Sequence, residues 1–435
     1  VPPDKSISHR VLILSSLAEG TSTVENLLES QDVLTTVKVL KNLGKTVEKE
    51  EKIWVIKESG WSEPEDVLNA ENSGTTARLI LGILSYLPFF SVITGDNSLR
   101  RRPMDRVVMP LTLMGGKFWA RKDRYLPVAI KGRRLHAINY TLPIPSAQVK
   151  SSIILAALSV SETSTIVEPI PSRDHTERMV KYMGGSIRRE GKNIIVSGKA
   201  KLKSRDFNVP GDFSSAAFFM ALAALIEGSS LTIEDVGLNP TRTGFLEVLK
   251  NMGVRIEVEL KEEEWEPRGS VKIEGGELSS IILKKEDIPK VIDEVPLIAL
   301  LATQAKGESR IEGAEELRVK ESDRIRNTVE NLRLMGAKIE ELPDYKSDSL
   351  KTIEALEDIA FLAERAEPYE KFEDRFDPRK ITPAREVYEA FELMVKGGIP
   401  DQSDFNYSVP NYNTELQCLW WLAEKNEFKE YEKVL

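Results

Sequence analysis

A repeated pattern of helix, glycine and strand runs through most of this chain and constrains its fold more than any other feature. In five segments an amphipathic helical stretch ends in Leu or Met, a glycine follows, and alternating strand-like residues come next. The five glycines are Gly44, Gly115, Gly184, Gly253 and Gly336, at intervals of 71, 69, 69 and 83 residues. A glycine is reasonable here because helices commonly end in a left-handed residue. The spacing therefore predicts a chain built from duplicated units.

A second series of helices alternates with the first. Its members begin with polar residues, continue with small and aliphatic side chains, and lie at residues 6–20, 73–87, 146–160, 214–228 and 293–307. Because these helices are apolar nearly all round, they are expected to be buried. Each unit then contains two helices and several strands, which is an α/β or α+β arrangement.

The repeat is predicted to stop near residue 344. The 91 residues from 345 to 435 contain two of the 26 glycines but 14 of the chain's aromatic residues. Helical spacing of apolar residues is visible in segments 352–367, 381–397 and 413–435. We therefore expect residues 344–435 to form a helical extension that does not belong to the repeats.

Composition excludes several kinds of partner and cofactor. The formal net charge of −9 argues against nucleic acid as a partner. No run of about 18 or more uncharged apolar residues occurs, so a membrane span is not expected. The single cysteine, Cys418, excludes intrachain disulfides and a multi-cysteine zinc site. We therefore expect a soluble cytoplasmic protein that acts as a monomer.

Polar residues at predicted helix starts are the candidates for chemistry. If Ser6 opens a helix, its hydroxyl and the free backbone N–H groups make an anion site, with Arg10 one turn further on the same face. The segment NSGTTAR repeats this arrangement with Asn72, Gly74 and Arg78. A glycine at a helix start also lets a ligand approach the backbone closely. For either motif alone, ordinary capping with solvated arginines is an equally good interpretation.

Similar residues recur at other predicted helix starts. They are Arg100–Arg102, Ser146, Gln148, Ser172, Arg173, His175, Lys320 and Arg324. This recurrence in an acidic protein favours a cleft that gathers positive charge around a small, strongly anionic substrate. Asp293 and Glu321 stand among these cations and suit proton transfer. Capping of the helix that follows is another role for Asp293, and both roles are compatible.

Eight ordered motifs resemble one enzyme family: PDKSISHR, NSGTTAR, RRRPM, SAQVKSS, PSRDH, GDFSSAAFF, IDEVPLIALLA and LRVKESDRI. Over about residues 1–343 the chain is similar to 5-enolpyruvylshikimate-3-phosphate synthases. The resemblance implies an α/β fold with two domains of repeated βαβαββ units and substrates bound between them. Residues 1–210 would form a complete three-unit domain, residues 211–343 an incomplete second domain, and residues 344–435 the helical extension.

The resemblance also implies an activity and its residues. The family moves the enolpyruvyl group of phosphoenolpyruvate to the 5-hydroxyl of shikimate 3-phosphate and releases phosphate, without a metal or other cofactor, in aromatic amino acid biosynthesis. Positions that match its shikimate 3-phosphate contacts are Lys5, Ser6, Arg10, Ser146, Ala147, Gln148, Ser172, Asp293 and Lys320. Positions that match its phosphoenolpyruvate contacts are Lys5, Asn72, Gly74, Arg102, Gln148 and Arg324. Asp293 would act as the base, with Glu321 and Lys5 as candidate proton donors.

The extension departs from the family pattern. After the last repeat the family continues with a Gly-Asp-His-Arg helix start and a later lysine, both of which contact phosphoenolpyruvate, and residues 344–435 contain no such motif. We therefore expect slow turnover or none. Two alternatives to an active transferase stay open: an inactive remnant that still binds shikimate 3-phosphate, and a fusion protein whose helical tail docks a partner.

Overall fold

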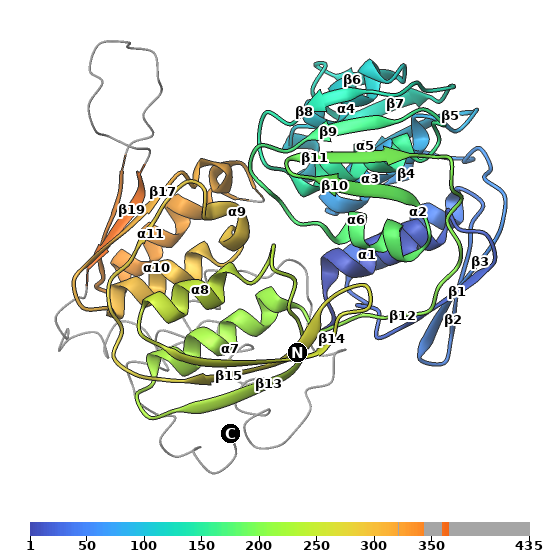
Figure 1. Ribbon diagram of the computed structural model, residues 1–435. Coiled ribbons are helices and arrows are strands. Elements are labelled where there is room, and N and C mark those ends of the chain that lie inside the picture. Colours follow the sequence, from blue (N-terminus) through green and yellow to red (C-terminus); the bar gives the residue numbers. More distant parts are fainter. Residues whose placement is uncertain (321, 343–358, 365–435) are drawn as a thin grey trace. The chain divides into compact units, whose positions relative to one another are not determined.

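The computed structural model describes residues 1–320, 322–342 and 359–364. Two compact units share these residues. The N-terminal unit comprises residues 2–212 and 262–268, whereas the C-terminal unit comprises Val1, residues 213–261 and the described residues from 269 onward. Helices and strands alternate along both units (Figure 1), which confirms the predicted α/β class.

The N-terminal unit repeats one element order: strand, helix, strand, helix and two further strands. The first copy comprises β12 (Phe207–Asn208), α1 (Lys5–Ser15), β1 (Thr21–Glu25), α2 (Gln31–Asn42), β2 (Thr46–Glu50) and β3 (Ile53–Lys57). The second comprises β4 (Leu68–Asn69), α3 (Gly74–Leu84), β5 (Phe90–Thr94), the 3₁₀ turn η1 (Leu99–Arg101), α4 (Asp105–Leu113), β6 (Lys117–Arg121) and β7 (Tyr125–Lys131). The third comprises β8 (Asn139–Thr141), α5 (Ala147–Ala157), β9 (Ser164–Val167), α6 (His175–Tyr182), β10 (Ser186–Glu190) and β11 (Asn193–Ser197).

Each copy builds a four-stranded sheet of the same topology. The second and third sheets have the strand orders β4-β5-β7-β6 and β8-β9-β11-β10, with the first two strands parallel and the others antiparallel. In the first sheet the leading position belongs to β12, which pairs in parallel with β1 so that Phe207 lies opposite Val24. Strand β12, near the end of the unit, therefore completes the sheet to which β1 belongs.

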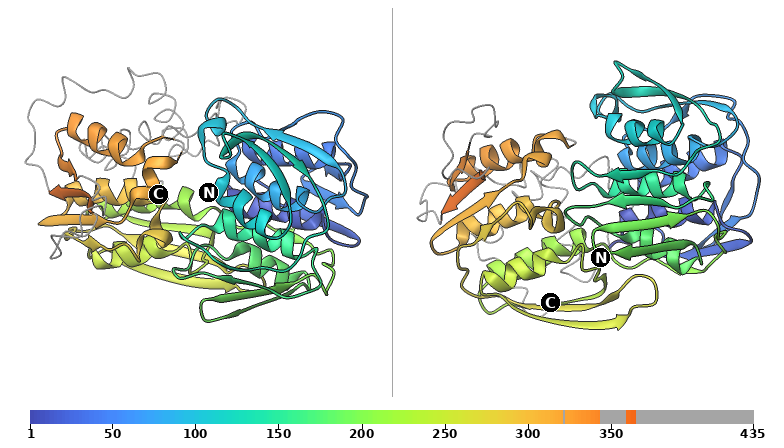
Figure 2. Two further views of the ribbon diagram at one scale, coloured as in Figure 1. Left: turned by 90° about the horizontal axis from the view of Figure 1, so that it is seen from above. Right: turned by 45° about the horizontal axis from the view of Figure 1, so that its top comes forward.

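The C-terminal unit follows the same order, except that its first copy has no leading strand among the described residues. Its first copy comprises α7 (Phe213–Leu225), β13 (Ser230–Gly237), α8 (Gly244–Asn251), β14 (Arg255–Glu262) and β15 (Arg268–Glu274). Its second comprises β16 (Ile282–Leu283), α9 (Ile288–Val291), α10 (Val295–Gln304), β17 (Glu308–Glu312), the 3₁₀ turn η2 (Glu315–Val319), α11 (Arg324–Leu334), β18 (Lys338–Glu341) and β19 (Ile359–Glu364). Helices α7 and α8 lie on the same side of the sheet β13-β15-β14 (Figures 1 and 2).

Both helix series of the sequence are confirmed. The five repeat glycines have φ between 80° and 101° and closely follow α2, α4, α6, α8 and α11. The apolar helices α1, α3, α5, α7 and α10 are mostly buried, as their composition predicts. No helix in the described part of the chain is long and apolar enough to cross a membrane.

Strand β19 corrects the predicted end of the repeats. It pairs antiparallel with both β17 and β18 in the order β16-β17-β19-β18, so the fifth copy continues to residue 364. The helix predicted for residues 352–367 is therefore wrong for residues 359–364. The two flanking strands each offer an edge whose backbone groups need partners, and this tertiary demand overrides local helical spacing. The rest of that helix, and those predicted at 381–397 and 413–435, lie outside the described residues.

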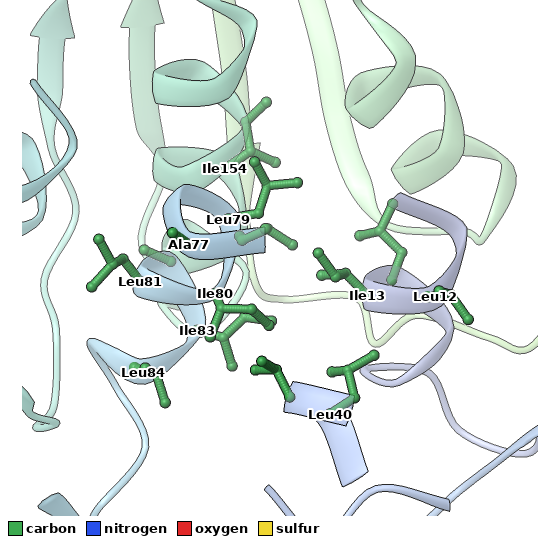
Figure 3. Packing of buried hydrophobic residues seen from close by; sticks show 14 of the residues in the cluster. Leu12, Ile13, Leu40, Ala77, Leu79, Ile80, Leu81, Ile83, Leu84 and Ile154 are labelled. Atoms are coloured by element: carbon green, nitrogen blue, oxygen red, sulfur yellow. The ribbon is translucent and has the colours of Figure 1, made fainter. Parts of the chain in front are cut away.

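Helices α3 and α5 pack closely inside the N-terminal unit. Figure 3 shows Ile80 of α3, Ile154 of α5 and Leu12 of α1 in one buried cluster. A Cβ atom on Gly82 would lie 2.4 Å from the backbone oxygen of Ser152, a distance that no side chain tolerates. Glycine at this position therefore allows α5 to lie directly against α3.

We expect the substitution Gly82→Ala to lower the free energy of unfolding by about 1–3 kcal/mol, because the added methyl group overpacks the helix contact. In a free helix the same change would stabilise, since alanine favours helix by about 1 kcal/mol over glycine. Urea unfolding measures the difference. Gly60→Ala is the control, since a Cβ on Gly60 meets nothing within 4 Å. Equal stability of the two variants would contradict the close-packing argument.

Residues 262–268 join β14 to β15 and pack within the N-terminal unit. Trp265 stacks on Tyr182 with ring centroids 6.2 Å apart and meets Phe207 edge-on at 5.2 Å. The buried carboxylate of Glu266 lies 2.9 Å from Nδ1 of His175. The repeat pattern gives no sign of these contacts, because they join segments more than 50 residues apart.

Candidate active site

Three buried helices of the N-terminal unit begin with a side-chain cap. The Asp4 carboxylate accepts the N–H of Ile7 in α1 at 2.8 Å, and the Ser73 and Ser146 hydroxyls accept N–H groups of α3 and α5 in the same way. The prediction that Ser6 opens α1 is wrong, because aspartate is an equally good cap and comes two residues earlier. Each start still presents backbone N–H groups and the positive end of a helix dipole.

The first turns of α3 and α5 are joined by side-chain hydrogen bonds. Gln148 donates from Nε2 to the Thr75 hydroxyl at 3.0 Å, and its Oε1 accepts from Arg78 at 2.8 Å. Arg78 also donates to the Pro103 carbonyl at 3.2 Å. The amide of Gln148, which the family resemblance assigns to both substrates, is therefore held in one orientation between two helices.

Asn72, Gly74 and Arg102 lie together at the start of α3. Arg102 is 8% exposed and donates to Oδ1 of Asn72 at 2.7 Å. A Cβ on Gly74 would lie 2.7 Å from Nη1 of Arg78 and 3.5 Å from Nη1 of Arg102, so glycine leaves space beside both guanidinium groups. Four of the positions matched to phosphoenolpyruvate contacts, these three and Gln148, are thus brought to neighbouring helix starts.

Arg10 links the helices α1, α5 and α6 by hydrogen bonds. Its guanidinium donates to the Thr176 hydroxyl of α6 at 2.8 Å, to the Ser151 hydroxyl of α5 at 3.1 Å and to the Ser6 carbonyl of α1 at 2.9 Å. Burial, followed by the nearby charge of Arg173, lowers the pKa of Arg10 to about 10, so it stays a cation at neutral pH. The alternative of a solvated arginine is therefore wrong for Arg10, which is buried and held by partners that the sequence does not reveal.

The other predicted positions of this unit occupy varied surroundings. Ala147 is the first residue of α5, next to its cap Ser146. Lys5 begins α1 with an exposed side chain whose Nζ lies 3.4 Å from the Asp32 carboxylate. Ser172 lies between β9 and α6 and donates its hydroxyl to Glu168 at 2.6 Å.

The C-terminal unit brings Asp293 and Arg324 together. Arg324 is the first residue of α11, and its Nη1 donates to Oδ1 of Asp293 at 3.1 Å. Lys320 ends the turn η2 just before this helix and is partly exposed. Glu321, a predicted proton donor, lies outside the described residues.

The capping role considered for Asp293 is wrong. The residue before α10 is Glu294, which makes no side-chain cap and instead accepts the Ser214 hydroxyl. Asp293 stands one residue earlier in a turn, where its carboxylate meets Arg324. A cation, Arg324, therefore holds this carboxylate.

In the N-terminal unit, sequence reasoning missed two groups of buried side chains around Arg10 and Ser172. Thr176 and Ser151 share a hydrogen bond of 2.6 Å and both accept from Arg10. Lys150 of α5 is wholly buried and contacts Glu168 and Glu177. A lysine in the middle of an otherwise apolar helix was the available signal, since such a charge is buried only with partners.

His9 is buried in α1 and linked to the start of α3. Its Nδ1 lies 2.7 Å from the Thr36 hydroxyl, which lies 2.7 Å from the Thr76 hydroxyl, and this in turn lies 2.7 Å from the cap Ser73. Burial, and then the charges of Lys5 and Arg10, lower the pKa of His9 well below 6.5. The imidazole is therefore neutral in the folded protein at physiological pH.

Acid is expected to destabilise the protein through His9. Its folded-state pKa lies below the unfolded value of 6.5, so stability is full above that pH and is lost as the pH falls towards the folded pKa. This group therefore lowers the free energy of unfolding as the pH falls from 7 to 5, because the unfolded chain binds a proton at His9 that the folded protein does not take up. Urea unfolding across this range should show a smaller loss for His9→Asn. His136→Asn, at an exposed histidine, is the control and should keep the loss; equal slopes for both variants would refute the assignment.

Among the described residues, no group of three or more His, Cys, Asp or Glu side chains could hold a metal ion. The groups gathered at the helix starts are guanidinium, amide, hydroxyl and backbone N–H donors, which suit anions.

Comparisons with known proteins identify the family. The model of the EPSP synthase (3-phosphoshikimate 1-carboxyvinyltransferase) family matches residues 1–359, beyond the predicted limit of the resemblance. The 3-phosphoshikimate 1-carboxyvinyltransferase of Thermotoga neapolitana is 48% identical over 345 residues, covering 79% of this chain and 82% of the relative. That of a Sulfurihydrogenibium species is 47% identical over 353 residues, with the same shares. A solved EPSP synthase from Acinetobacter baumannii is 38% identical, with a TM-score of 0.72 over 86% of this chain and 82% of that one.

The chain therefore belongs to the EPSP synthase family, and the resemblance stated from its motifs is confirmed. The enolpyruvyl transferase fold is confirmed with it.

Proposed function

We propose that this chain transfers the enolpyruvyl group of phosphoenolpyruvate to the 5-hydroxyl of shikimate 3-phosphate and releases phosphate. The family match over residues 1–359 carries this proposal. The hydrogen-bonded arginines and amides at the helix starts support it, because both substrates are small polyanions that need fixed donors. The reaction belongs to chorismate and aromatic amino acid biosynthesis.

The N-terminal unit supplies anion-binding groups in this proposal. Asn72, Gly74, Arg102 and Gln148, together with Lys5, bind phosphoenolpyruvate. Shikimate 3-phosphate binds Lys5, Ser6, Arg10, Ser146, Ala147, Gln148 and Ser172. Because Arg102 and Gln148 are already held by protein hydrogen bonds, little side-chain freedom is lost when a substrate arrives.

In this proposal the C-terminal unit supplies the base Asp293 and the proton-donor candidate Glu321, and the N-terminal unit supplies the candidate Lys5. In the addition step the methylene carbon of phosphoenolpyruvate gains a proton, while the 5-hydroxyl oxygen bonds to the neighbouring carbon and gives its proton to Asp293. In the elimination step the new methyl group loses a proton and phosphate leaves. Arg324 and Lys320 bind the substrate anions, and Glu321 and Lys5 are the proton-donor candidates.

We also propose that the protein acts as a cytoplasmic monomer whose partners are these two substrates. The net charge of −9 supports the exclusion of nucleic acid.

A phosphate-release assay with the purified chain tests the function. Release that requires both phosphoenolpyruvate and shikimate 3-phosphate is the expected result, and omission of either substrate is the control. Calorimetry with shikimate 3-phosphate separates the alternatives. Binding without any phosphate release would contradict the transferase and favour an inactive remnant, whereas absence of both would refute the site as well.

A further inference from the structure

Lys150 is a buried cation that the proposed reaction does not use. Its side chain is 0% exposed, although it stands only two residues after Gln148 on α5. Its ammonium group lies 2.9 Å from Oε1 of Glu168, 2.8 Å from Oε1 of Glu177 and 3.2 Å from the Ser172 carbonyl oxygen. The ammonium group donates a hydrogen bond to the Ser172 carbonyl, and the two carboxylates compensate its charge.

Glu168 is surrounded by four hydrogen-bond donors and a second cation. Oε1 accepts the Ser172 N–H at 3.0 Å and the Ser172 hydroxyl at 2.6 Å, and forms an ion pair with Lys150. Oε2 accepts two N–H groups of Arg189, both at 3.0 Å. A carboxylate offers about four lone-pair sites, so the four hydrogen bonds fill them, and Lys150 compensates the charge in addition. If one donor leaves, the carboxylate keeps three hydrogen bonds and the ion pair with Lys150.

The Ser172 hydroxyl is the donor that can leave. Lys150 and Arg189 carry charge, and the Ser172 N–H is fixed by the backbone, whereas the hydroxyl can rotate about one bond. A hydroxyl has a single proton, and an anionic oxygen must be met by a donor. While this proton points to Glu168, Ser172 shows only lone pairs to an anion. Ser172 can therefore bind a substrate anion only by turning its proton away from Glu168.

We propose that Lys150 and Glu168 are positioning residues for Ser172. They hold its main chain from both sides, through the carbonyl oxygen and the N–H, and leave its hydroxyl proton free to move to an anionic oxygen of shikimate 3-phosphate. With Lys150 in place, Glu168 keeps three hydrogen bonds and the ion pair with Lys150 after the hydroxyl leaves. Without Lys150 the buried carboxylate loses that cation, so the hydroxyl becomes necessary to Glu168 and is withheld from the ligand. This inference rests on the proposed function, which assigns Ser172 to the substrate.

A double-mutant cycle tests this assignment. Lys150→Met should weaken binding of shikimate 3-phosphate about tenfold by calorimetry, which corresponds to the loss of one hydrogen bond to a charged group. KM for shikimate 3-phosphate should rise similarly, with kcat within about threefold. In a Ser172→Ala background the same substitution should change affinity less than about twofold, because residues that act through one group are not additive. Lys45→Met, at a buried lysine that donates to the Ser59 carbonyl, is the matched control and should leave affinity unchanged.

Two results would overturn the inference: an undiminished affinity in Lys150→Met, or an equal loss with and without the Ser172 hydroxyl. If Lys150→Met does not fold, Lys150→Met combined with Glu177→Gln replaces it in the cycle, because one carboxylate fewer is then left without its cation. Failure of the unmodified chain to bind shikimate 3-phosphate would instead refute the proposed function on which the inference depends.

Discussion

Replacing Asp293 by asparagine is expected to lower kcat by about 10²–10⁴-fold, the usual contribution of a positioned general base. The amide keeps the size of the side chain and an oxygen for the hydrogen bond from Arg324, which is 3.1 Å away in the native protein. It does not accept the proton of the 5-hydroxyl group. Substrate binding should therefore change little, and phosphate release at saturating concentrations of both substrates gives the measurement.

Asp287→Asn provides the matched control for this substitution. Asp287 precedes α9 in the same unit and accepts the backbone N–H of Lys284 at 3.1 Å, so it is held by a local turn. Its replacement should leave kcat unchanged. A kcat for Asp293→Asn within about threefold of the native value would remove Asp293 from proton transfer. A rise in KM alone would mean that the carboxylate only binds substrate.

The repeated part of the fold could be predicted because each copy carries its own local signals. A glycine such as Gly184 indicates the end of a helix, and the apolar composition of a helix such as α5 predicts that it is buried. Strands β12 and β19 could not be predicted in this way. β12 has two residues and is defined by its pairing with β1, and β19 lies in a segment with helical spacing. Their structure depends on sheet edges formed by distant residues.

In the candidate site, too, local features could be predicted from the sequence and long-range contacts could not. The motifs with polar helix starts locate Asn72, Gly74 and Gln148, since helix capping and dipoles are local properties. The partners that fix these groups come from other copies, as with Arg10, which donates to Thr176 at a distance of 166 residues along the chain. The resemblance supplies roles for the residues that it matches. It assigns no role to Lys150, whose place in an apolar helix signals burial but whose partners are seen only in the structure.

Glu168→Ala is expected to lower the free energy of unfolding by about 3–5 kcal/mol, the range for removing one partner of a buried ion pair. The Glu168 side chain is 0% exposed, forms an ion pair with Lys150, and accepts hydrogen bonds from Arg189 and both donors of Ser172. Its loss leaves the Ser172 N–H without its acceptor and the ammonium group without one carboxylate, and opens a cavity. Urea unfolding at pH 7 measures the change. Glu162→Ala, at an exposed turn before β9, should stay within about 0.5 kcal/mol of the native chain.

Glu177 gives a sharper comparison because it contacts the same ammonium group. Burial raises the pKa of Glu177 above its usual 4.5, and the attraction of Lys150 offsets this only in part. A raised folded-state pKa means that this carboxyl contributes its stability below the unfolded pKa and loses it as the pH rises through the folded value. At pH 7 the raised pKa of the Glu177 carboxyl therefore lowers the free energy of unfolding. Glu177→Gln should be at least as stable as the native chain at this pH. The difference in stability should shrink as the pH falls towards 4.5. A large loss of stability in Glu177→Gln at pH 7 would show that Lys150 depends on both carboxylates equally, contrary to the role assigned to Glu168.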